Sequence, residues 1–375
     1  MKFTEITVEW SQQTFLFYLS IILVCYLLTV YLKKRNISWG GGLKMPAGLF
    51  VVALILLFVK GFSTTGRDLR VGYAANFESA TSIQRYRDPT IEFGFMLLQI
   101  ITKVLTDRYE VFIFVVGLIT VLPVIYMINK YKNKIDVPAA VLLFLCVYFF
   151  NGFSSLRQYM AVSISLLAFD AIAEKRTMKA LFWISAASLF HVTCLVLMIP
   201  YFFMLFRRMS KKMIAFSAAV MFVVFYFGRS SFIALVVGSN ERYKNYTMSE
   251  SVQFGMEVFI YFIPLFVLLF VCRRLDHDKY FSKLTYVYLV LGFLFGMMKY
   301  ILSIFGRFQP VFMPGVIICV PYYVRLYKEH HRKNRRFLLN VVTVLYGLAR
   351  FIIWITQYYI LEDLMPYTNI FGNVI

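Results

Sequence analysis

Long apolar stretches recur along the whole chain, and they constrain its fold more than any other feature. A bilayer-spanning helix needs roughly 17–25 mostly apolar residues, and runs of about this length alternate here with short clusters of lysine and arginine. In lipid every backbone polar group must be paired within the protein, and the sequence lacks the alternating pattern of a membrane β-barrel. It therefore predicts an all-α, polytopic transmembrane helical bundle forming a single integral membrane domain, residues 1–375.

The positions of the basic clusters predict the orientation of these spans. Lysine and arginine concentrate in cytoplasmic loops, so we assign six clusters to the inner side and both termini to the outer side. The clusters are Lys33–Lys44, Lys130–Lys134, Lys175–Lys179, Arg207–Lys212, Arg273–Arg274 and Arg325–Arg336. The candidate spans are 15–32, 45–61, 111–128, 137–151, 157–173, 180–206, 213–228, 256–272, 283–305, 308–324 and 337–360.

Two stretches do not follow simple alternation. Residues 93–105 are too few for an ordinary span and include Lys103, so we expect a re-entrant or interfacial helix. Residues 180–206 have basic clusters at both ends, and a helical hairpin turning near His191 agrees with this better than one span. The bundle then has about 12 spans.

Composition excludes a soluble protein. Hydrophobic residues make up 60% of the chain and charged residues 15%, whereas a soluble domain carries about a quarter charged residues. The formal net charge of +20 comes from residues beside the spans, where membrane lipids with anionic headgroups are the expected contact. No basic and aromatic module outside the spans indicates nucleic-acid binding. His277, His330 and His331 lack the spacing of metal ligands, so we expect no metal site.

Two segments expected on the outer side are long enough to hold chemistry, residues 62–92 and 229–255. The first contains Arg67, Asp68, Tyr73 and Glu92; the second contains Glu241, Arg242, Tyr243, Lys244, Tyr246 and Glu250. A carboxylate held just above the membrane can act as a general base toward a sugar hydroxyl, and tyrosine rings can stack on sugars. Asp68 has the alternative of a salt bridge with Arg67 or Arg70. Glu92 has the alternative of complementing a helix dipole.

Two arginines lie where apolar stretches meet the expected outer side. Arg157 opens a helix with Gln158 beside it, and a helix N-terminus attracts anions. Arg307 lies between two spans. If both reach one cavity they can hold a diphosphate, because each guanidinium binds two oxygens at once. Arg157 has the alternative of snorkelling to lipid headgroups, and His191 that of a hydrogen-bonded structural residue.

Two other charges inside apolar stretches are given structural roles. Asp170 is expected to pair with Lys175 or Arg176 near the inner end of its span. Lys299 is expected to extend outward along its helix toward the lipid surface.

The order of these motifs resembles the EpsG family of Wzy-like polysaccharide polymerases. The resemblance runs from about Phe62 to Pro314, and Arg-Gln-x-x-Ala followed by Phe-His is its more specific part. Its motifs are Asp68 with Tyr73, Glu92-Phe-Gly-Phe95, Ser155-Leu-Arg157-Gln158-Tyr159-Met-Ala161, Phe190-His191-Val-Thr193 ahead of Pro200, and Gly306-Arg307-Phe308 ahead of Pro314. The first loop departs from the family pattern, since Arg67 separates Gly66 from Asp68 and Tyr73 follows five residues later.

The resemblance implies a multi-pass enzyme of the bacterial inner membrane, a glycosyltransferase. It would join polyprenyl-diphosphate-linked oligosaccharide repeat units into capsular, O-antigen or exopolysaccharide chains on the outer face. No cofactor is expected, because the donor is already activated, and a chain-length-regulating co-polymerase is an expected partner. The implied catalytic residues are Asp68 and His191, and the implied substrate-binding residues are Arg157, Gln158, Arg307, Tyr73, Glu92 and Arg67.

Two other functions remain open. A membrane O-acyltransferase modifying the glycan would need an acyl donor entering from inside and a histidine site within the membrane. A flippase or transporter for lipid-linked oligosaccharide would line a central path with charges at mid-membrane depth and have short outer loops. The two long outer segments favour the polymerase.

Overall fold

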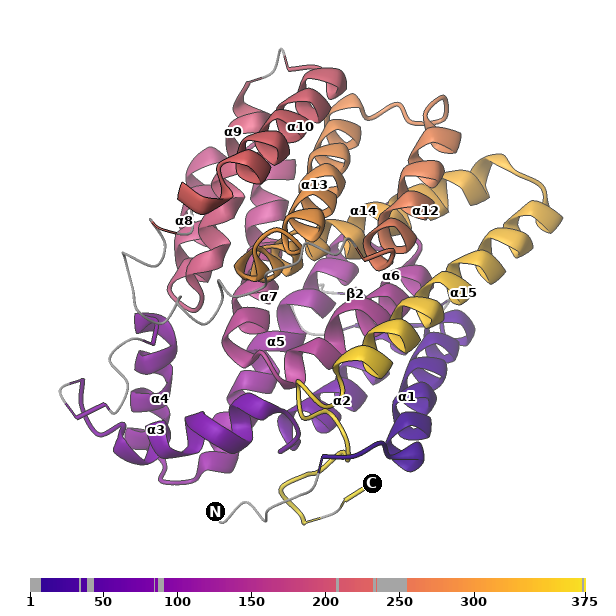
Figure 1. The fold of residues 1–375 in the computed structure, drawn as a ribbon. Helices are drawn as coiled ribbons and strands as arrows, with labels where there is room; N and C mark the ends of the chain where they lie inside the picture. The colour runs from indigo at the N-terminus through magenta and orange to yellow at the C-terminus, as the bar shows by residue number, and fades with distance from the viewer. Residues whose placement is uncertain are drawn as a thin grey trace.

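The computed structural model consists almost entirely of helices (Figure 1). It describes residues 8–33, 35–38, 44–83, 85–86, 91–206, 209–231, 234, 255–372 and 374–375, without the side chains of residues 38, 70 and 71. The first helices are α1 (Gln12–Tyr31), α2 (Ala47–Gly61), α3 (Ala74–Ser79), α4 (Phe93–Leu105), α5 (Tyr109–Tyr131), α6 (Val137–Phe144) and α7 (Leu156–Ala173). The later ones are α8 (Thr177–Ser188), α9 (Met198–Leu205), α10 (Lys211–Phe227), α12 (Glu257–Cys272), α13 (Lys279–Met298), α14 (Gln309–His330) and α15 (Lys333–Tyr358).

Short irregular helices and one small hairpin connect these elements. The π-helical turns are η1 (Leu69–Tyr73) and η2 (Leu145–Phe149), and the 3-10 turns are η3 (Phe150–Phe153), η4 (Val192–Leu197) and η6 (Ser303–Arg307). The antiparallel pair β1 (Asn36–Ser38) and β2 (Lys44–Pro46) lies between α1 and α2, with Ile37 opposite Met45.

The predicted class, a multi-pass helical membrane protein, is confirmed. Among the described residues, six helices are long and apolar enough to cross a membrane: Gln12–Tyr31, Tyr109–Tyr131, Leu156–Ala173, Lys279–Met298, Ser303–His330 and Lys333–Tyr358. The shorter apolar helices are Ala47–Gly61, Phe93–Leu105, Val137–Phe153, Val192–Leu205 and Glu257–Cys272. Because these shorter helices do not reach span length, the count of about 12 spans stays a prediction.

Two of the expected spans are interrupted. Helix α8 ends at Ser188, and the chain passes through His191 into η4, which packs back against α8. The predicted break near His191 is therefore confirmed. The expected span 283–305 is wrong in extent, because α13 ends at Met298 and a separate turn, η6, begins at Ser303.

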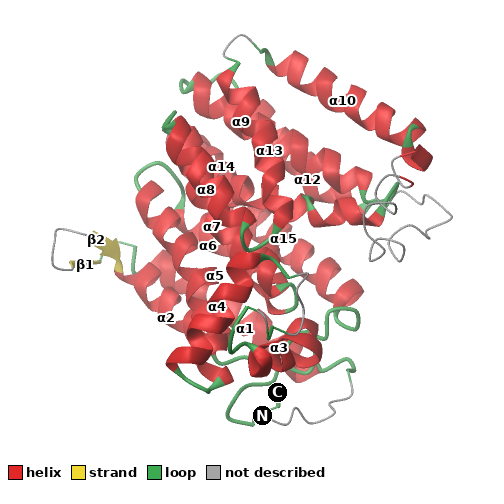
Figure 2. Cartoon of the chain, turned by 90° about the vertical axis from the view of Figure 1, so that its left-hand side faces the viewer, coloured by secondary structure: helices red, strands yellow, loops and turns green. Residues whose placement is uncertain are grey.

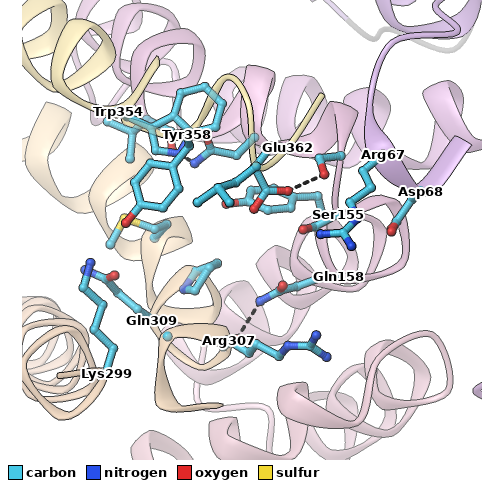
Figure 3. A pocket seen from close by; sticks show the side chains of 18 of the residues that line it. Arg67, Asp68, Ser155, Gln158, Lys299, Arg307, Gln309, Trp354, Tyr358 and Glu362 are labelled. Atoms are coloured by element: carbon cyan, nitrogen blue, oxygen red, sulfur yellow. Dashed lines mark hydrogen bonds between the residues drawn. The ribbon is translucent and has the colours of Figure 1, made fainter. Parts of the chain in front are cut away.

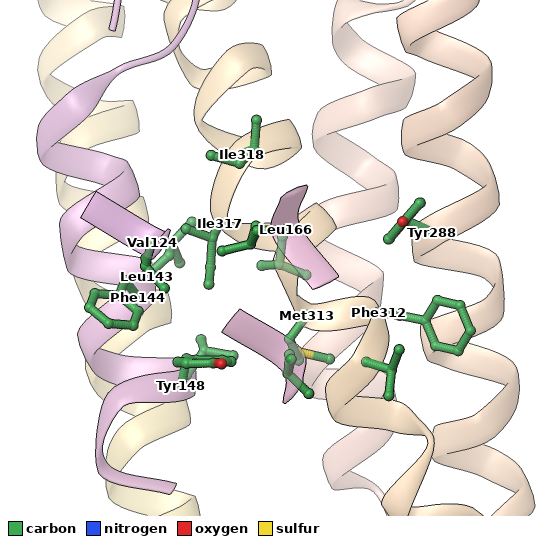
Figure 4. Packing of buried hydrophobic residues seen from close by; sticks show 14 of the residues in the cluster. Val124, Leu143, Phe144, Tyr148, Leu166, Tyr288, Phe312, Met313, Ile317 and Ile318 are labelled. Atoms are coloured by element: carbon green, nitrogen blue, oxygen red, sulfur yellow. The ribbon is translucent and has the colours of Figure 1, made fainter. Parts of the chain in front are cut away.

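Helix α7 lies at the centre of the bundle, and its sequence explains why. Small residues such as Ala161, Ser163 and Ala168 recur along it, and small side chains let helix backbones approach closely inside a membrane protein. Helices α5, α8 and α14 pack against α7, and buried side chains such as Leu166 and Ile317 fill the space between them (Figure 4). This packing fixes the N-terminus of α7, which carries Arg157.

The two ends of the bundle differ in charge. The start of α1 and the C-terminus lie at one end, which we call the terminal end (Figures 1 and 2). The opposite end has a cavity of about 680 Å³ with a strongly basic lining. Its basic residues are Lys33, Lys44, Lys132, Arg325, Lys328 and Arg336. They come from three of the six clusters that were predicted to share one side, and these three do share one end.

A C-terminal tail, residues 359–375, folds back over the terminal end. The Thr64 N–H donates to the Thr368 carbonyl at 2.9 Å, and the Arg67 N–H donates to the Glu362 carbonyl at 3.3 Å. These bonds join the tail to the segment that follows α2. The tail thus fixes the beginning of the first predicted loop against the bundle.

Candidate active site

The terminal end contains a cavity of about 830 Å³, which we call the terminal cavity (Figure 3). Polar and charged side chains from the segment after α2, from α7, η6 and α15, and from the tail line it. Seven of the eight residues implied by the resemblance lie on this lining: Arg67, Asp68, Tyr73, Arg157, Gln158, His191 and Arg307. Glu92 lies behind Arg157. The expected residues of the second loop, Glu241 to Glu250, lie outside the described residues.

Backbone packing brings the first loop against the N-terminus of α7. Gly66 adopts a φ of +109°, and a Cβ at this position would lie 2.0 Å from the Phe153 carbonyl oxygen. Only glycine accepts both the left-handed φ and the close approach. Lys60, at the end of α2, is buried and donates to the Gly152 carbonyl from the other side. The turn preceding α7 is therefore held between α2 and the first loop.

Arg157 is held in place by two neighbours. Its Nη1 forms an ion pair with Glu92, and its Nε donates to the Tyr73 hydroxyl. Tyr73 in turn packs on Phe95, with ring centroids 4.8 Å apart. Within the described part of the chain neither contact uses Nη2, so this end of the guanidinium is available to a phosphate oxygen. Glu92 precedes the first residue of α4 but points toward Arg157 and does not cap its own helix.

Gln158 links the segments that carry the two predicted arginines. Its Nε2 donates to the backbone carbonyl of Arg307 at 2.6 Å (Figure 3). This bond fastens η6 to the first turn of α7 although the two residues are far apart in sequence. Gln158 thus connects the walls of the cavity. Convergence of Arg157 and Arg307 on one cavity, which the sequence left open, is what the structure shows.

Asp68 lies at the N-terminus of α7. Its Oδ2 accepts the Leu156 N–H at 3.2 Å, and the Tyr73 hydroxyl also donates to this carboxylate. Burial raises the pKa of Asp68, while the positive charge of Arg157 and these hydrogen bonds oppose the rise. The alternative of a salt bridge with Arg67 is wrong, because among described side chains Asp68 contacts the α7 N-terminus and Tyr73 instead. The side chain of Arg70, the other expected partner, lies outside the described residues.

His191 begins η4 and is buried, with 6% of its surface exposed. Its Nδ1 accepts the Thr193 N–H at 3.3 Å and lies 2.8 Å from the Thr193 hydroxyl. Burial lowers the pKa of His191 to about 4, so the ring is neutral near pH 7. Because Nδ1 is an acceptor, the single ring proton lies on Nε2. In this form His191 offers the cavity a hydrogen-bond donor.

Four further charged residues line the cavity and were not proposed from the sequence: Glu257, Lys299, Arg350 and Glu362. Lys299 was expected to extend toward lipid, but it forms an ion pair with Glu257 instead. Arg350 is buried, and its guanidinium lies 3.8 Å from the centroid of the Tyr261 ring. An ionisable residue within an apolar span is a functional candidate by default, and this signal was present for Lys299 and Arg350.

Asp170, at the opposite end of the bundle, also has a different partner from the expected one. Asp170 was expected to pair with Lys175 or Arg176. It pairs with Lys130 at 2.6 Å and accepts a hydrogen bond from the Tyr131 hydroxyl at 3.1 Å. The partner comes from α5, a neighbour of α7 in space and not in sequence.

The charges of the terminal cavity favour an anionic ligand. Five of its lining residues are cationic (Arg67, Arg157, Lys299, Arg307 and Arg350) and three are carboxylates (Asp68, Glu257 and Glu362). Arginine binds phosphate oxygens through paired N–H groups, and the lining also presents aromatic rings, among them Trp354 and Tyr358, of the kind that stack on sugars. Among the described residues, no three His, Cys, Asp or Glu side chains are grouped as metal ligands. The cavity thus combines groups for a phosphate and for a sugar.

Comparison with known proteins agrees with this chemistry. The sequence model of the EpsG family matches residues 47–369, which include every residue assigned to the terminal cavity. No curated protein and no solved structure matches the chain. The chain belongs to the EpsG family, a family of Wzy-like polysaccharide polymerases.

Proposed function

We propose that the chain is an oligosaccharide repeat-unit polymerase of the bacterial inner membrane. Its substrates are two polyprenyl-diphosphate-linked oligosaccharides, one carrying the growing chain and one carrying a new repeat unit. The reaction takes place in the terminal cavity, on the outer face of the membrane. The product is a capsular, O-antigen or exopolysaccharide chain, and a chain-length-regulating co-polymerase is its expected partner.

One observation carries this proposal: two arginines from distant parts of the sequence line a single cavity with an excess of positive charge. As the glycosidic bond breaks, negative charge develops on the diphosphate oxygen that leaves. A cation already in place stabilises that charge without reorganisation. Arg157 and Arg307 supply this stabilisation, so no metal or nucleotide cofactor is required for the leaving group.

The remaining predicted residues have supporting roles in this scheme. Tyr73 and Glu92 orient Arg157, and Gln158 keeps the turn that bears Arg307 beside it. Arg67 adds positive charge at the rim of the cavity, where its side chain is exposed. His191 donates a hydrogen bond from Nε2 to the bound substrate. Asp68 fixes the position of the α7 N-terminus.

The experiment uses purified protein in detergent with polyprenyl-diphosphate-linked repeat units. The wild type should lengthen the glycan, which gives a ladder of products on a gel. Arg157→Ala should be expressed and folded but should leave single repeat units. Arg176→Ala is the matched control, because Arg176 is exposed at the opposite end of the bundle and should give the wild-type ladder.

Each alternative function predicts a different result. A flippase cannot lengthen a chain in detergent, because it needs a membrane with two sides. An O-acyltransferase would add acyl mass to the glycan without changing the number of repeat units. A wild-type ladder from Arg157→Ala would contradict the role of the arginine.

A further inference from the structure

Glycosyl transfer requires a group that accepts the proton of the attacking hydroxyl, and the two expected candidates, Asp68 and His191, both have structural contacts of their own. Asp68 Oδ2 accepts the Leu156 N–H, and the Tyr73 hydroxyl also donates to this carboxylate, so Asp68 holds the α7 N-terminus. His191 carries its ring proton on Nε2, because Nδ1 accepts from Thr193. A neutral histidine in this form donates a proton to a hydrogen bond and cannot accept one. The other carboxylates on the cavity lining are therefore further candidates for the base.

We propose that the carboxylate of Glu362 accepts this proton. Glu362 lines the terminal cavity together with Arg307 and Gln158 (Figure 3). Its Oε2 accepts a hydrogen bond from the Ser154 hydroxyl. Within the described part of the chain Oε1 accepts no hydrogen bond, so this oxygen can approach a sugar hydroxyl. The inference rests on the polymerase function proposed above.

The tail places Glu362 at the cavity with little freedom to move. The Glu362 N–H donates to the Tyr358 carbonyl at 3.0 Å, and its own carbonyl accepts the Arg67 N–H at 3.3 Å. Two residues on, the tail is anchored again, since the Tyr18 hydroxyl donates to the Leu364 carbonyl at 2.8 Å. Fixed backbone on both sides of a base lowers the cost of orienting it for reaction.

The reaction step balances in atoms and charge. The oxygen of the acceptor hydroxyl forms a bond with the anomeric carbon of the donor sugar, and its proton passes to Glu362 Oε1. The bond between that carbon and the diphosphate oxygen breaks, and its electron pair stays on the diphosphate, where Arg157 and Arg307 receive the charge. Glu362 then returns the proton to solvent. Direct attack with one base inverts the anomeric configuration.

The surroundings of Glu362 set its titration. Burial raises the pKa of Glu362, the Ser154 hydrogen bond opposes the rise, and the charge of Asp68 adds to it. The guanidinium groups of Arg67 and Arg307 also oppose the rise, and the phenol of Tyr358 is a further ionisable group near this carboxylate. As a base, Glu362 works only when ionised. Activity should therefore fall about tenfold per pH unit below its pKa.

The decisive variant is Glu362→Gln, which keeps the shape of the side chain and removes its basicity. We expect kcat for chain lengthening to fall by about 100-fold to 10,000-fold. The dissociation constant for polyprenyl diphosphate alone should change by less than about threefold, because the arginines are unaffected. Asp363→Asn is the matched control: this neighbour does not line the cavity, and its positive φ is one that asparagine adopts. The control should keep wild-type kcat.

Each result decides one point. If Glu362→Gln keeps more than about a tenth of wild-type kcat, Glu362 is not the base, while the polymerase function stands. If the wild type itself fails to lengthen the glycan, the polymerase function fails first. Should Glu362→Gln not fold, Glu362→Asp provides the test, since moving the carboxylate must shift the acid side of the pH profile of kcat/KM. A profile identical to that of the wild type would overturn the proposal.

Discussion

Replacing Tyr73 with phenylalanine tests how the terminal cavity holds Arg157. The ring is buried, with 5% of its surface exposed, and its packing on Phe95 would remain. Only the hydroxyl is lost, and with it the acceptor for Arg157 Nε and the donor to Asp68. A hydrogen bond to a charged group contributes about 1.5–3 kcal/mol. If one such bond stabilises the transition state, its loss lowers kcat/KM about 10-fold to 150-fold.

The assay is the rate of glycan lengthening by purified protein, with the thermal midpoint measured in parallel. Tyr86→Phe is the matched control. Tyr86 is also buried and donates its hydroxyl to Gln99 Oε1, but it does not line the cavity. Tyr86→Phe should lower stability without changing kcat/KM by more than about twofold. If Tyr73→Phe has wild-type kcat/KM and wild-type stability, the hydroxyl does not orient Arg157.

Three further perturbations test other parts of the structure. Gly66→Ala should cost more than about 1 kcal/mol of stability, because the φ of Gly66 is left-handed and a Cβ would meet the Phe153 carbonyl. Gly72→Ala is the control: a Cβ there meets nothing within 4 Å, so the thermal midpoint should not change. Asp170→Asn should cost about 1.5–3 kcal/mol, because the buried carboxylate loses its charge-assisted bonds to Lys130, which then keeps only Glu174. The more exposed Glu174→Gln should cost less than about 1 kcal/mol. A smaller effect at Asp170 would show that its ion pair is dispensable. Burial lowers the pKa of His191 from 6.5 to about 4, so below pH 6.5 the unfolded state binds more protons than the folded state. The free energy of unfolding should therefore drop by about 3 kcal/mol between pH 6.5 and pH 4. His191→Asn should remove this part of the pH dependence in thermal melts, and an unchanged pH dependence would contradict it.

The apolar runs predicted the helices well, because a lipid environment leaves the backbone almost no other choice. The same reasoning placed Arg157 and Arg307 correctly. Both follow or precede apolar stretches on the same predicted side, and helix ends on one side of a bundle meet. A shared side of the bundle could be anticipated for both without coordinates, whereas their convergence on one cavity was left open by the sequence. The hydrogen bond from Gln158 that joins the two segments could not be anticipated, because nothing in the local sequence specifies it.

Partner choice was harder to predict, since it depends on which helices are neighbours. Asp170 pairs with Lys130, 40 residues earlier, although basic residues lie much closer in sequence. Lys299 pairs with Glu257 for the same reason. Glu362 was missed because a carboxylate after the last apolar run resembles an ordinary loop residue. Its position depends on backbone pairing with the segment after α2, and hydrophobic periodicity carries no signal for such pairing.

The tail also has a consequence for biosynthesis. The tail is bonded to early segments of the chain, since the Thr64 N–H donates to the Thr368 carbonyl and the Tyr367 N–H donates to the Thr14 hydroxyl at 3.0 Å. A ribosome delivers Arg157 and Arg307 to the membrane before Glu362 has been translated. Under the role proposed for Glu362, a nascent polypeptide therefore lacks its base until residue 362 has been translated. Prematurely terminated products should be inert, and should not consume lipid-linked sugars that the cell needs elsewhere.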